Sequence, residues 1–246
     1  MQAQSQVAPR RPALQKDPMT VMVLKATDPI EYGSPGQRKT KVFLATVATS
    51  NQVFQVKVLN FKLKKAFKEK NVIILSQYIR YKNVLEINQR SSVLKAPENQ
   101  TIEVPERIWI RAQNPPKIIA LRQENSDNLP TIVSGLFRLK KKKDRKKTTA
   151  YVIEDDTGTM EVVGSEICYG IRCEEGDILR LFCFYLKKIK EDLKLISGKY
   201  SVLEVFNTNN QEQPSSLTIK LQFEMNSPQK PRGINCTIKM ENTAEE

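Results

Sequence analysis

The sequence predicts an all-β fold with short helices, because one pattern of five strands occurs twice along the chain. In each copy a lone strand is followed by a hairpin, then a long apolar strand, then two shorter strands; the copies span residues 18–104 and 129–206. Five strands in a segment of this size are typical of the OB-fold, a small Greek-key barrel that often binds nucleic acid. We therefore expect two tandem OB-fold barrels joined by a helical linker.

Local patterns in each copy support the barrels. Apolar and polar residues alternate in MTVMVLKA and FQVKVL as they do in half-buried strands. Asn60 precedes FKLKKAFKEK, and we expect it to cap a short helix that plugs the first barrel after its third strand. In the second copy EDDTG stands between AYVI and TMEVV, which predicts a hairpin turn rather than a catalytic carboxylate cluster.

The segment between the copies, residues 105–128, is predicted to be a helical linker. Pro105 opens PERIWIRAQNPPK, and Ile108, Trp109 and Ala112 recur at helical spacing. Trp109 is the only tryptophan. One interpretation makes it a base-stacking or partner-docking residue; we favour an apolar wedge that packs between the two barrels.

The two ends of the chain are predicted to be disordered. Residues 1–17 are rich in Gln, Ala and Pro without periodicity, and residues 207–246 are polar and contain Pro. Within the second stretch LTIKLQFEM alternates like a strand, so local pairing there stays open.

Composition favours a polyanionic partner. The chain has 246 residues, 40 Lys and Arg against 27 Asp and Glu, and a formal net charge of +13. It has no histidine, which excludes Ser-His-Asp and Cys-His nucleophiles and imidazole metal ligands. Its 4 cysteines have no C-x-x-C spacing, so we expect free thiols, no metal, no cofactor and no catalytic residues. No apolar run approaches the ~18 residues that span a bilayer.

The basic residues gather in clusters that acidic residues mostly do not interrupt. The clusters lie on a strand end and the following helix, in the linker, around a hairpin loop of the second copy, and after its long strand: Lys57, Lys62, Lys64, Lys65, Lys68 and Lys70; Arg107, Arg111, Lys117 and Arg122; Arg138, Lys140, Lys141, Lys142, Lys143, Arg145, Lys146 and Lys147; Lys187, Lys188, Lys190 and Lys194. Each cluster taken alone fits a solvated face. Together they favour phosphate contacts to a duplex, with little base readout, because no aromatic platform stands out beyond the candidate stackers Tyr78, Tyr81 and Tyr151.

Several blocks of the chain resemble the HIN domain of the interferon-inducible PYHIN proteins. They are KDPMTVMVLKATDPIEY, FLATVATSNQVFQVKVLN, the PPKI that ends the linker, DDTGTMEVVG and CEEGDILRLFCF, in the family's order. The resemblance implies two OB-folds that grip the phosphates of both strands of double-stranded DNA without sequence preference. It implies no enzyme activity.

The resemblance also suggests contact residues, which match basic positions or basic segments of the family: Lys25, Lys57, Lys62, Lys64, Lys65, Arg111, Lys117 and Arg180. Three features depart from the family. Thr27 and Asp28 stand where DNA-sensing members can have lysines, Glu204 stands where the family often has lysine, and Phe43-Leu44-Ala45-Thr46 replaces Phe-His-Ala-Thr. The two acidic residues are expected to weaken the phosphate grip at those points.

The family's roles set the expected biology. They imply innate immune DNA sensing or its regulation, and transcriptional control, in the nucleus and also in the cytoplasm. The family's N-terminal pyrin domain has no counterpart in residues 1–17. Three explanations stay open: the chain is a fragment of a longer protein, a splice form, or a member that lacks the module; if it is complete, we expect a decoy or regulator. The alternative hypothesis is a protein-interaction module that contacts other PYHIN proteins or transcription regulators, with DNA binding incidental.

Overall fold

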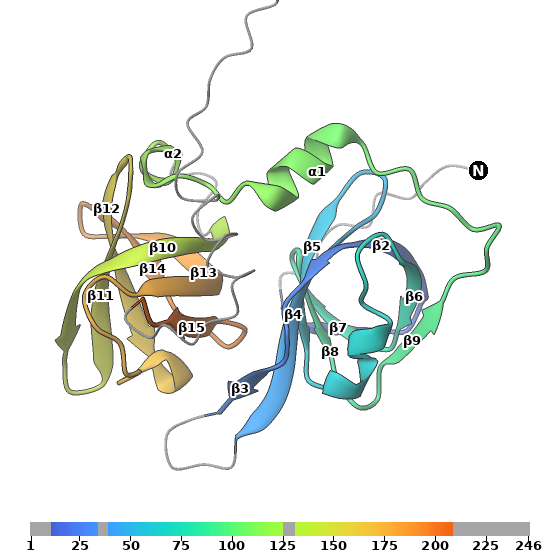
Figure 1. Ribbon diagram of the computed structural model, residues 1–246, viewed down its shortest axis with the longest axis horizontal. Coiled ribbons are helices and arrows are strands. Elements are labelled where there is room, and N and C mark those ends of the chain that lie inside the picture. The colour runs from blue at the N-terminus through green and yellow to red at the C-terminus, as the bar shows by residue number, and fades with distance from the viewer. Residues whose placement is uncertain (1–10, 34–38, 125–130, 209–246) are drawn as a thin grey trace, which may run out of the picture. The chain divides into compact units, whose positions relative to one another are not determined.

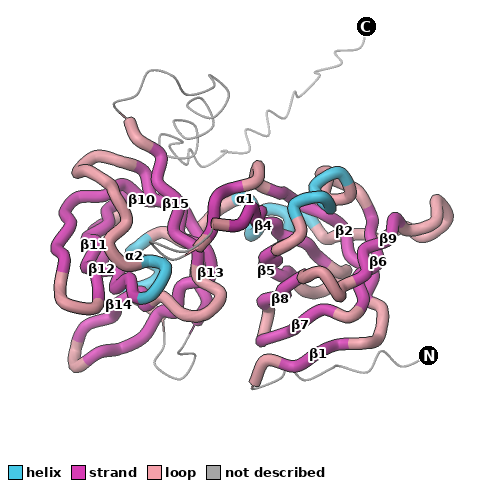
Figure 2. The backbone as a smooth tube through the Cα atoms, turned by 90° about the horizontal axis from the view of Figure 1, so that it is seen from below, coloured by secondary structure: helices cyan, strands magenta, loops and turns pink. Residues whose placement is uncertain are grey.

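The computed structural model describes residues 11–33, 39–124 and 131–208, and strands make up most of them (Figures 1 and 2). Two separate sheets follow each other along the chain, with two short helices in the connection between them. The predicted all-β class with tandem OB-folds is confirmed. Residues 1–10 of the expected leader and 209–246 of the expected tail, LTIKLQFEM included, lie outside the described residues.

The first sheet is strongly curved and its path nearly returns to its start. Its strands are β1 (Ala13–Gln15), β2 (Met19–Ala26), β3 (Ile30–Tyr32), β4 (Thr40–Ala48), β5 (Val53–Val58), β6 (Val72–Ser76), β7 (Tyr78–Tyr81), β8 (Val84–Ile87) and β9 (Ser92–Lys95). The order is β1-β7-β8-β5-β4-β2-β6-β9, with β3 paired to β4. Only Gln77, at φ 54°, separates β6 from β7, so these two strands act as one long strand bent at a left-handed residue.

A short helix plugs this barrel where the sequence predicts one. The 3-10 helix η1 (Phe61–Lys65) begins after Asn60, whose side-chain oxygen accepts a 3.2 Å hydrogen bond from Lys62 N. Just beyond η1, Phe67 is 1% exposed. Its ring meets that of Phe43 edge-on at 5.2 Å between centroids, which anchors the plug in the core.

The second sheet closes into a barrel. Its strands are β10 (Thr131–Asp144), β11 (Thr148–Asp155), β12 (Gly158–Ser165), β13 (Ile178–Ile189), β14 (Asp192–Ile196) and β15 (Val202–Phe206), with the 3-10 helix η3 (Glu166–Cys168) after β12. The order is β10-β11-β12-β14-β13-β15, and β10 also pairs with β13, which completes the ring. The long strand β13 again bends at a left-handed residue, Cys183 at φ 55°. The two copies of the strand pattern therefore also share a bend at a left-handed residue in a long strand.

One prediction of disorder is wrong for three residues. Ala13–Gln15, inside the expected leader 1–17, form β1 and pair antiparallel with β7. Without β1, β7 would present an open edge of unpaired backbone groups. The strand is held by its backbone pairing, since Leu14 remains 57% exposed.

The connection between the barrels contains α1 (Glu106–Gln113) and α2 (Ile118–Arg122) (Figure 1). The sequence predicts α1 but not α2. Trp109 packs with Ala112 beside a cluster of Leu24, Ala48 and Ile108. All of these residues belong to the first barrel or to α1, so the prediction that Trp109 is a wedge between the barrels is wrong. An apolar stripe on a helix shows that the helix is covered, but not by which neighbour.

The carboxylate of Asp155 fixes α2 to the second barrel. Its Oδ2 accepts a 2.8 Å hydrogen bond from Ile118 N, and its Oδ1 accepts bonds from the backbone N–H groups of Thr157 and Gly158. The segment EDDTG is thus the predicted hairpin turn between β11 and β12, and it also caps a helix. Ile118 and Leu121 are then buried in the core of the second barrel.

Replacing Asp155 with Ala should lower the free energy of unfolding by about 2–3 kcal/mol, because it leaves several backbone N–H groups without their charged acceptor. The neighbouring Asp156→Ala variant is the matched control. Asp156 is exposed and loses only a surface ion pair with Lys117, worth about 0–1 kcal/mol. Urea denaturation of both variants measures the difference; equal losses would show that Asp155 does not anchor α2.

Candidate nucleic-acid interface

Four of the eight predicted contact residues lie together on the first barrel. Lys62 and Lys65 are exposed on η1 and form no ion pair with another described residue. Lys64 Nζ lies 3.4 Å from the backbone oxygen of Ala26 and 3.8 Å from Asp28 Oδ1. This contact places η1 against the end of β2, the strand that carries the exposed Lys25.

Lys57 is not on this surface, which corrects its predicted role as a phosphate contact. It is 2% exposed. Its ammonium lies 3.8 Å from the centroid of the Tyr32 ring and donates a hydrogen bond to the Tyr32 hydroxyl. Burial lowers the pKa of Lys57 to about 8, although nearby Glu86 opposes that shift. A side chain covered in this way cannot reach a phosphate without a rearrangement.

The remaining three predicted residues are spread over the connector and the second barrel. Arg111 is exposed on α1 and has no ion pair within the described part of the chain. Lys117 precedes α2, and its Nζ is 2.6 Å from Asp156 Oδ1. Arg180 on β13 faces Glu204 on β15, with 2.6 Å between Nη1 and Oε2. Its guanidinium also lies 4.7 Å from the centroid of the Phe206 ring.

The two acidic residues that depart from the family pattern each lie beside a predicted contact residue. Asp28 is close to Lys64, and Glu204 is paired with Arg180. Burial raises the pKa of Glu204, while the Arg180 charge and hydrogen bond lower it. Both acids therefore reduce the positive potential available to a phosphate at these points.

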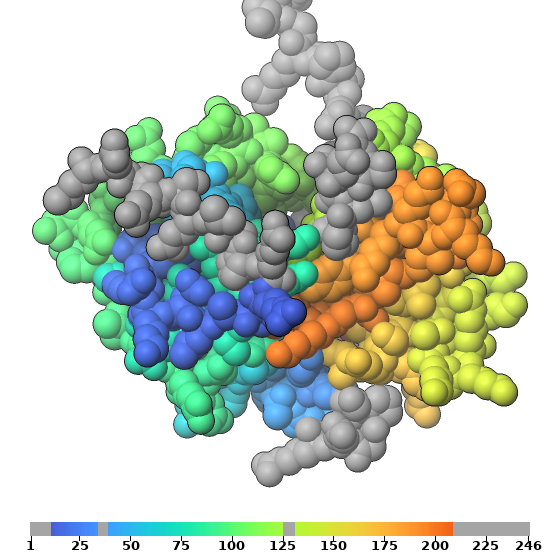
Figure 3. All heavy atoms as spheres, turned by 180° about the vertical axis from the view of Figure 1, so that it is seen from behind, coloured from blue at the N-terminus to red at the C-terminus, as the bar shows by residue number. Residues whose placement is uncertain are grey.

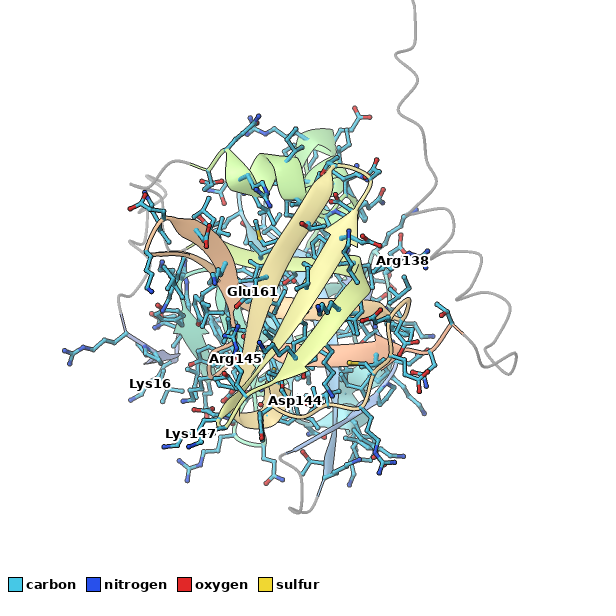
Figure 4. The ribbon with its side chains drawn as sticks, turned by 90° about the vertical axis from the view of Figure 1, so that its left-hand side faces the viewer. Lys16, Arg138, Asp144, Arg145, Lys147 and Glu161 are labelled. Atoms are coloured by element: carbon cyan, nitrogen blue, oxygen red, sulfur yellow. The ribbon has the colours of Figure 1, made fainter. Side chains whose placement is uncertain are left out.

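The densest set of unpaired cations is on the β10–β11 hairpin, outside the predicted set. Lys141, Lys143, Lys146 and Lys147 are exposed and form no ion pair with a described residue. Three other cations of this hairpin pair with carboxylates at 3.2–3.4 Å: Lys140 with Glu154, Lys142 with Asp144 and Arg145 with Glu161. Figure 4 shows Arg145 and Lys147 near the end of the β10–β11 hairpin. In Figure 3 the atoms of this hairpin are yellow-green and project from the molecule. The signal was visible in the sequence as KKKKDRKK.

The aromatic side chains of the described residues do not form a base-stacking platform. Of the three candidate stackers, Tyr78 is 3% exposed and Tyr151 is fully buried. Tyr81 is half-buried and stacks on Tyr200 at 6.1 Å between ring centroids. Among the described residues Phe61 is the one aromatic ring with a large exposed fraction, 46%. The surface therefore offers positive charge for phosphates and few rings for unstacked bases.

A family model matches most of the chain: the HIN-200/IF120x domain, over residues 15–186. The chain belongs to this family. Human myeloid cell nuclear differentiation antigen is 46% identical over 217 residues, which are 88% of this chain and 52% of the relative. Human interferon-inducible protein AIM2 is 40% identical over 195 residues, 79% of this chain and 56% of the relative. The chain spans between a third and a little over half of the length of curated relatives such as these.

Solved structures of HIN domains share this fold. The Ifi202 HINa domain in complex with 20bp dsDNA has a TM-score of 0.64 and 36% identity, and the match covers 80% of this chain and 100% of that one. The p202 HIN1 domain in complex with 12-mer dsDNA has a TM-score of 0.63 and 35% identity, with 80% and 96% covered. Both are similar to this HIN domain over its two barrels.

The thiols of this HIN domain are poor candidates for chemistry. Cys168, Cys173 and Cys183 are free, and burial raises the pKa of each thiol, to about 12 for Cys168 and about 11 for Cys173. Thiols held protonated are weak nucleophiles and weak metal ligands. Within residues 11–33, 39–124 and 131–208 no three His, Cys, Asp or Glu side chains gather as a metal site would require. Over the same ranges no helix is long and apolar enough to cross a membrane.

Proposed function

We propose that this HIN domain binds double-stranded DNA through its phosphates, without reading the base sequence and without enzyme activity. The observation that carries the proposal is the contrast on its surface. Among the described residues, lysine and arginine side chains such as Lys62, Lys65 and Arg111 are exposed without acidic partners, whereas every aromatic ring except that of Phe61 is buried or half-buried. Such a surface favours backbone contacts, which position a protein on a duplex but carry no sequence information. Two similar HIN domains were solved with double-stranded DNA.

The proposed contacts are the predicted set without the buried Lys57: Lys25, Lys62, Lys64, Lys65, Arg111, Lys117 and Arg180. They come from both barrels and from the connector. Lys117 and Arg180 already hold a carboxylate each, so a phosphate must compete with that partner. The alternative surface for phosphate contacts is the β10–β11 hairpin.

Charge reversal in the connector should weaken duplex binding. For the double variant Arg111→Glu and Lys117→Glu we expect about a ten- to hundredfold loss of affinity at fixed low salt, because two phosphate contacts become repulsive. Each change is at an exposed side chain, so the free energy of unfolding should move by about 0.5 kcal/mol or less per residue. Fluorescence anisotropy with a labelled duplex measures the first effect and urea denaturation the second.

The matched control is the hairpin variant Lys146→Glu and Lys147→Glu, which changes the net charge by the same amount. If the proposed interface is right, this control loses less affinity for the duplex than the connector variant does. A larger loss in the hairpin variant would move the contact surface there while leaving DNA binding intact. If neither variant binds more weakly, phosphate contacts do not hold the duplex.

The cellular role follows from the family and is part of the proposal. We infer a nuclear protein, present also in the cytoplasm, that takes part in innate immune sensing of DNA or its regulation, and in transcriptional control. The relatives that carry this inference are named interferon-inducible protein AIM2 and myeloid cell nuclear differentiation antigen. Reporter assays of interferon and inflammasome output, with and without the chain, test whether it activates or restrains the response.

A second candidate function is a protein-interaction module, and one observation favours it. Asp28, Asp156 and Glu204 pair with three of the proposed contact residues inside the chain. A similar domain, p202 HIN2, was solved as a tetramer, with a TM-score of 0.63 and 32% identity over 80% of this chain. Sedimentation analysis separates the two functions: self-association without measurable duplex binding at low salt would favour this module.

A further inference from the structure

The connector is divided between the two barrels. Ile108 of α1 is buried with Leu24 and Ala48 of the first barrel. By contrast, α2 is capped by Asp155 and buried in the second core, and Pro115 lies against Gly135, where an added Cβ would stand 3.1 Å from the proline Cβ. Between these anchored parts lies Asn114, with φ −100° and ψ 103°. It is the residue at which the chain passes from one barrel to the other.

A small apolar cluster joins the barrels, and we call it the seam. Its buried members are Leu44 and Val84 from the first barrel and Phe182, Cys183, Tyr200 and Val202 from the second; Ile30, Tyr32, Tyr81 and Ile132 pack beside them. These six buried residues compare with 14 and 16 in the two barrel cores. Because apolar stabilisation scales with buried area, the seam opens more easily than either barrel unfolds.

Polar groups at the seam weaken it further. Lys57 is 2% exposed and bonds to the hydroxyl of Tyr32, a seam residue, and it forms no ion pair within the described residues. The Tyr200 hydroxyl is buried without a hydrogen-bond partner. A buried ammonium held by a neutral phenol has lost most of its hydration without gaining a paired charge, which is costly.

We propose that Lys57 and Tyr32 form a charge-sensitive latch, and that the barrels separate as rigid units about Asn114 more readily when Lys57 is charged than when it is neutral. Neutral, the Lys57 amine stays under the seam at little cost. The charged Lys57 ammonium regains its hydration only when the seam opens. This property belongs to the chain itself and does not depend on the proposed binding of DNA.

The sign of the pH effect follows from Lys57. Its pKa is about 8 in the closed seam against an ordinary 10.5 in water, so opening takes up a proton between about pH 8 and 10.5, where Lys57 is neutral in the closed seam and charged in water. The closed seam therefore gains stability as pH rises through 8 and loses it as pH falls. Its charged neighbours are Glu86 on β8, which attracts the ammonium, and Lys199, which repels it.

The other titratable groups at the seam or beside it do not reverse that sign. They are Tyr32 on β3, Tyr185 and Cys183 on β13, Tyr200 before β15 and Cys168 on η3. Burial raises the pKa of each of these groups above its ordinary value, so the closed state keeps their protons up to pH 8.5.

The thiol of Cys183 reports opening, because it is buried in the seam, whereas Cys168 is buried in the second core. We would alkylate the native chain with N-ethylmaleimide and follow each cysteine by peptide mass spectrometry. Each rate is divided by that of the urea-unfolded chain at the same pH, which removes the intrinsic effect of thiolate formation. The corrected Cys183 rate should be about fourfold lower at pH 8.5 than at pH 7, and faster than the Cys168 rate at both.

Variants connect this pH effect to Lys57. In Lys57→Met the corrected Cys183 rate should be several-fold slower than wild type at pH 7 and no longer vary with pH. Tyr32→Phe, which keeps the ring but removes the hydroxyl, should label faster, and the exposed-site control Lys68→Met should match wild type. The latch is wrong if Cys183 and Cys168 react at one common rate, which would report whole-barrel unfolding, or if Lys57→Met keeps the wild-type pH dependence.

Discussion

Replacing Gly164 with Ala should lower the free energy of unfolding by about 3 kcal/mol or more. A Cβ at this position of β12 would lie 2.2 Å from the carbonyl oxygen of Cys168 and 2.8 Å from the Tyr151 ring. Neither neighbour can move freely, because the Tyr151 hydroxyl donates a 2.9 Å hydrogen bond to that same oxygen in the core. The strand cannot shift either, since Gly164 is paired with Thr149 on β11.

Gly170→Ala is the control for this variant. Gly170 has φ +62°, and no atom lies within 4 Å of an added Cβ, so the substitution costs only the left-handed backbone penalty of about 1–2 kcal/mol. Urea denaturation compares the two variants with wild type. Equal losses would mean that Gly164 is required by backbone conformation alone and that η3 is not packed against β12 as described.

Local patterns were sufficient to predict the elements of the fold. Asn60 caps η1, and EDDTG makes the β11–β12 turn, because capping and turn formation depend on residues close in sequence. The strand repeat follows from alternation of apolar residues and from segment length. Alternation does not show what covers the outer face of each strand. In FQVKVL, Phe54, Val56 and Val58 point into the first core.

Long-range neighbours were not predictable, and they decide the site. Lys57 alternates with those core residues and so points outward, but Tyr32 and the seam cover it there. Likewise Lys117 and Arg180 look like free cations in the sequence, whereas folding gives each a carboxylate from another strand or turn. Charge runs indicate where cations are numerous; the fold decides which remain unpaired, as on the β10–β11 hairpin.

The largest binding effect we expect is that of salt. A duplex held by Z phosphate contacts releases condensed counterions, so log K falls against log salt with a slope of about −0.9Z. If all seven proposed residues make a contact, the slope is about −6, and the affinity falls by about 4,000-fold between 50 and 200 mM salt. The ion pairs of Lys117 and Arg180 would make the slope shallower if they persist in the complex.

The measurement that tests phosphate-based, sequence-independent binding most directly is a salt titration with several duplexes of one length and unrelated sequences. We predict affinities within a few-fold of one another at each salt concentration, a common steep slope, and a shallower slope for the variant Arg111→Glu and Lys117→Glu. A strong preference for one sequence at fixed salt, or a slope near zero, would contradict the account.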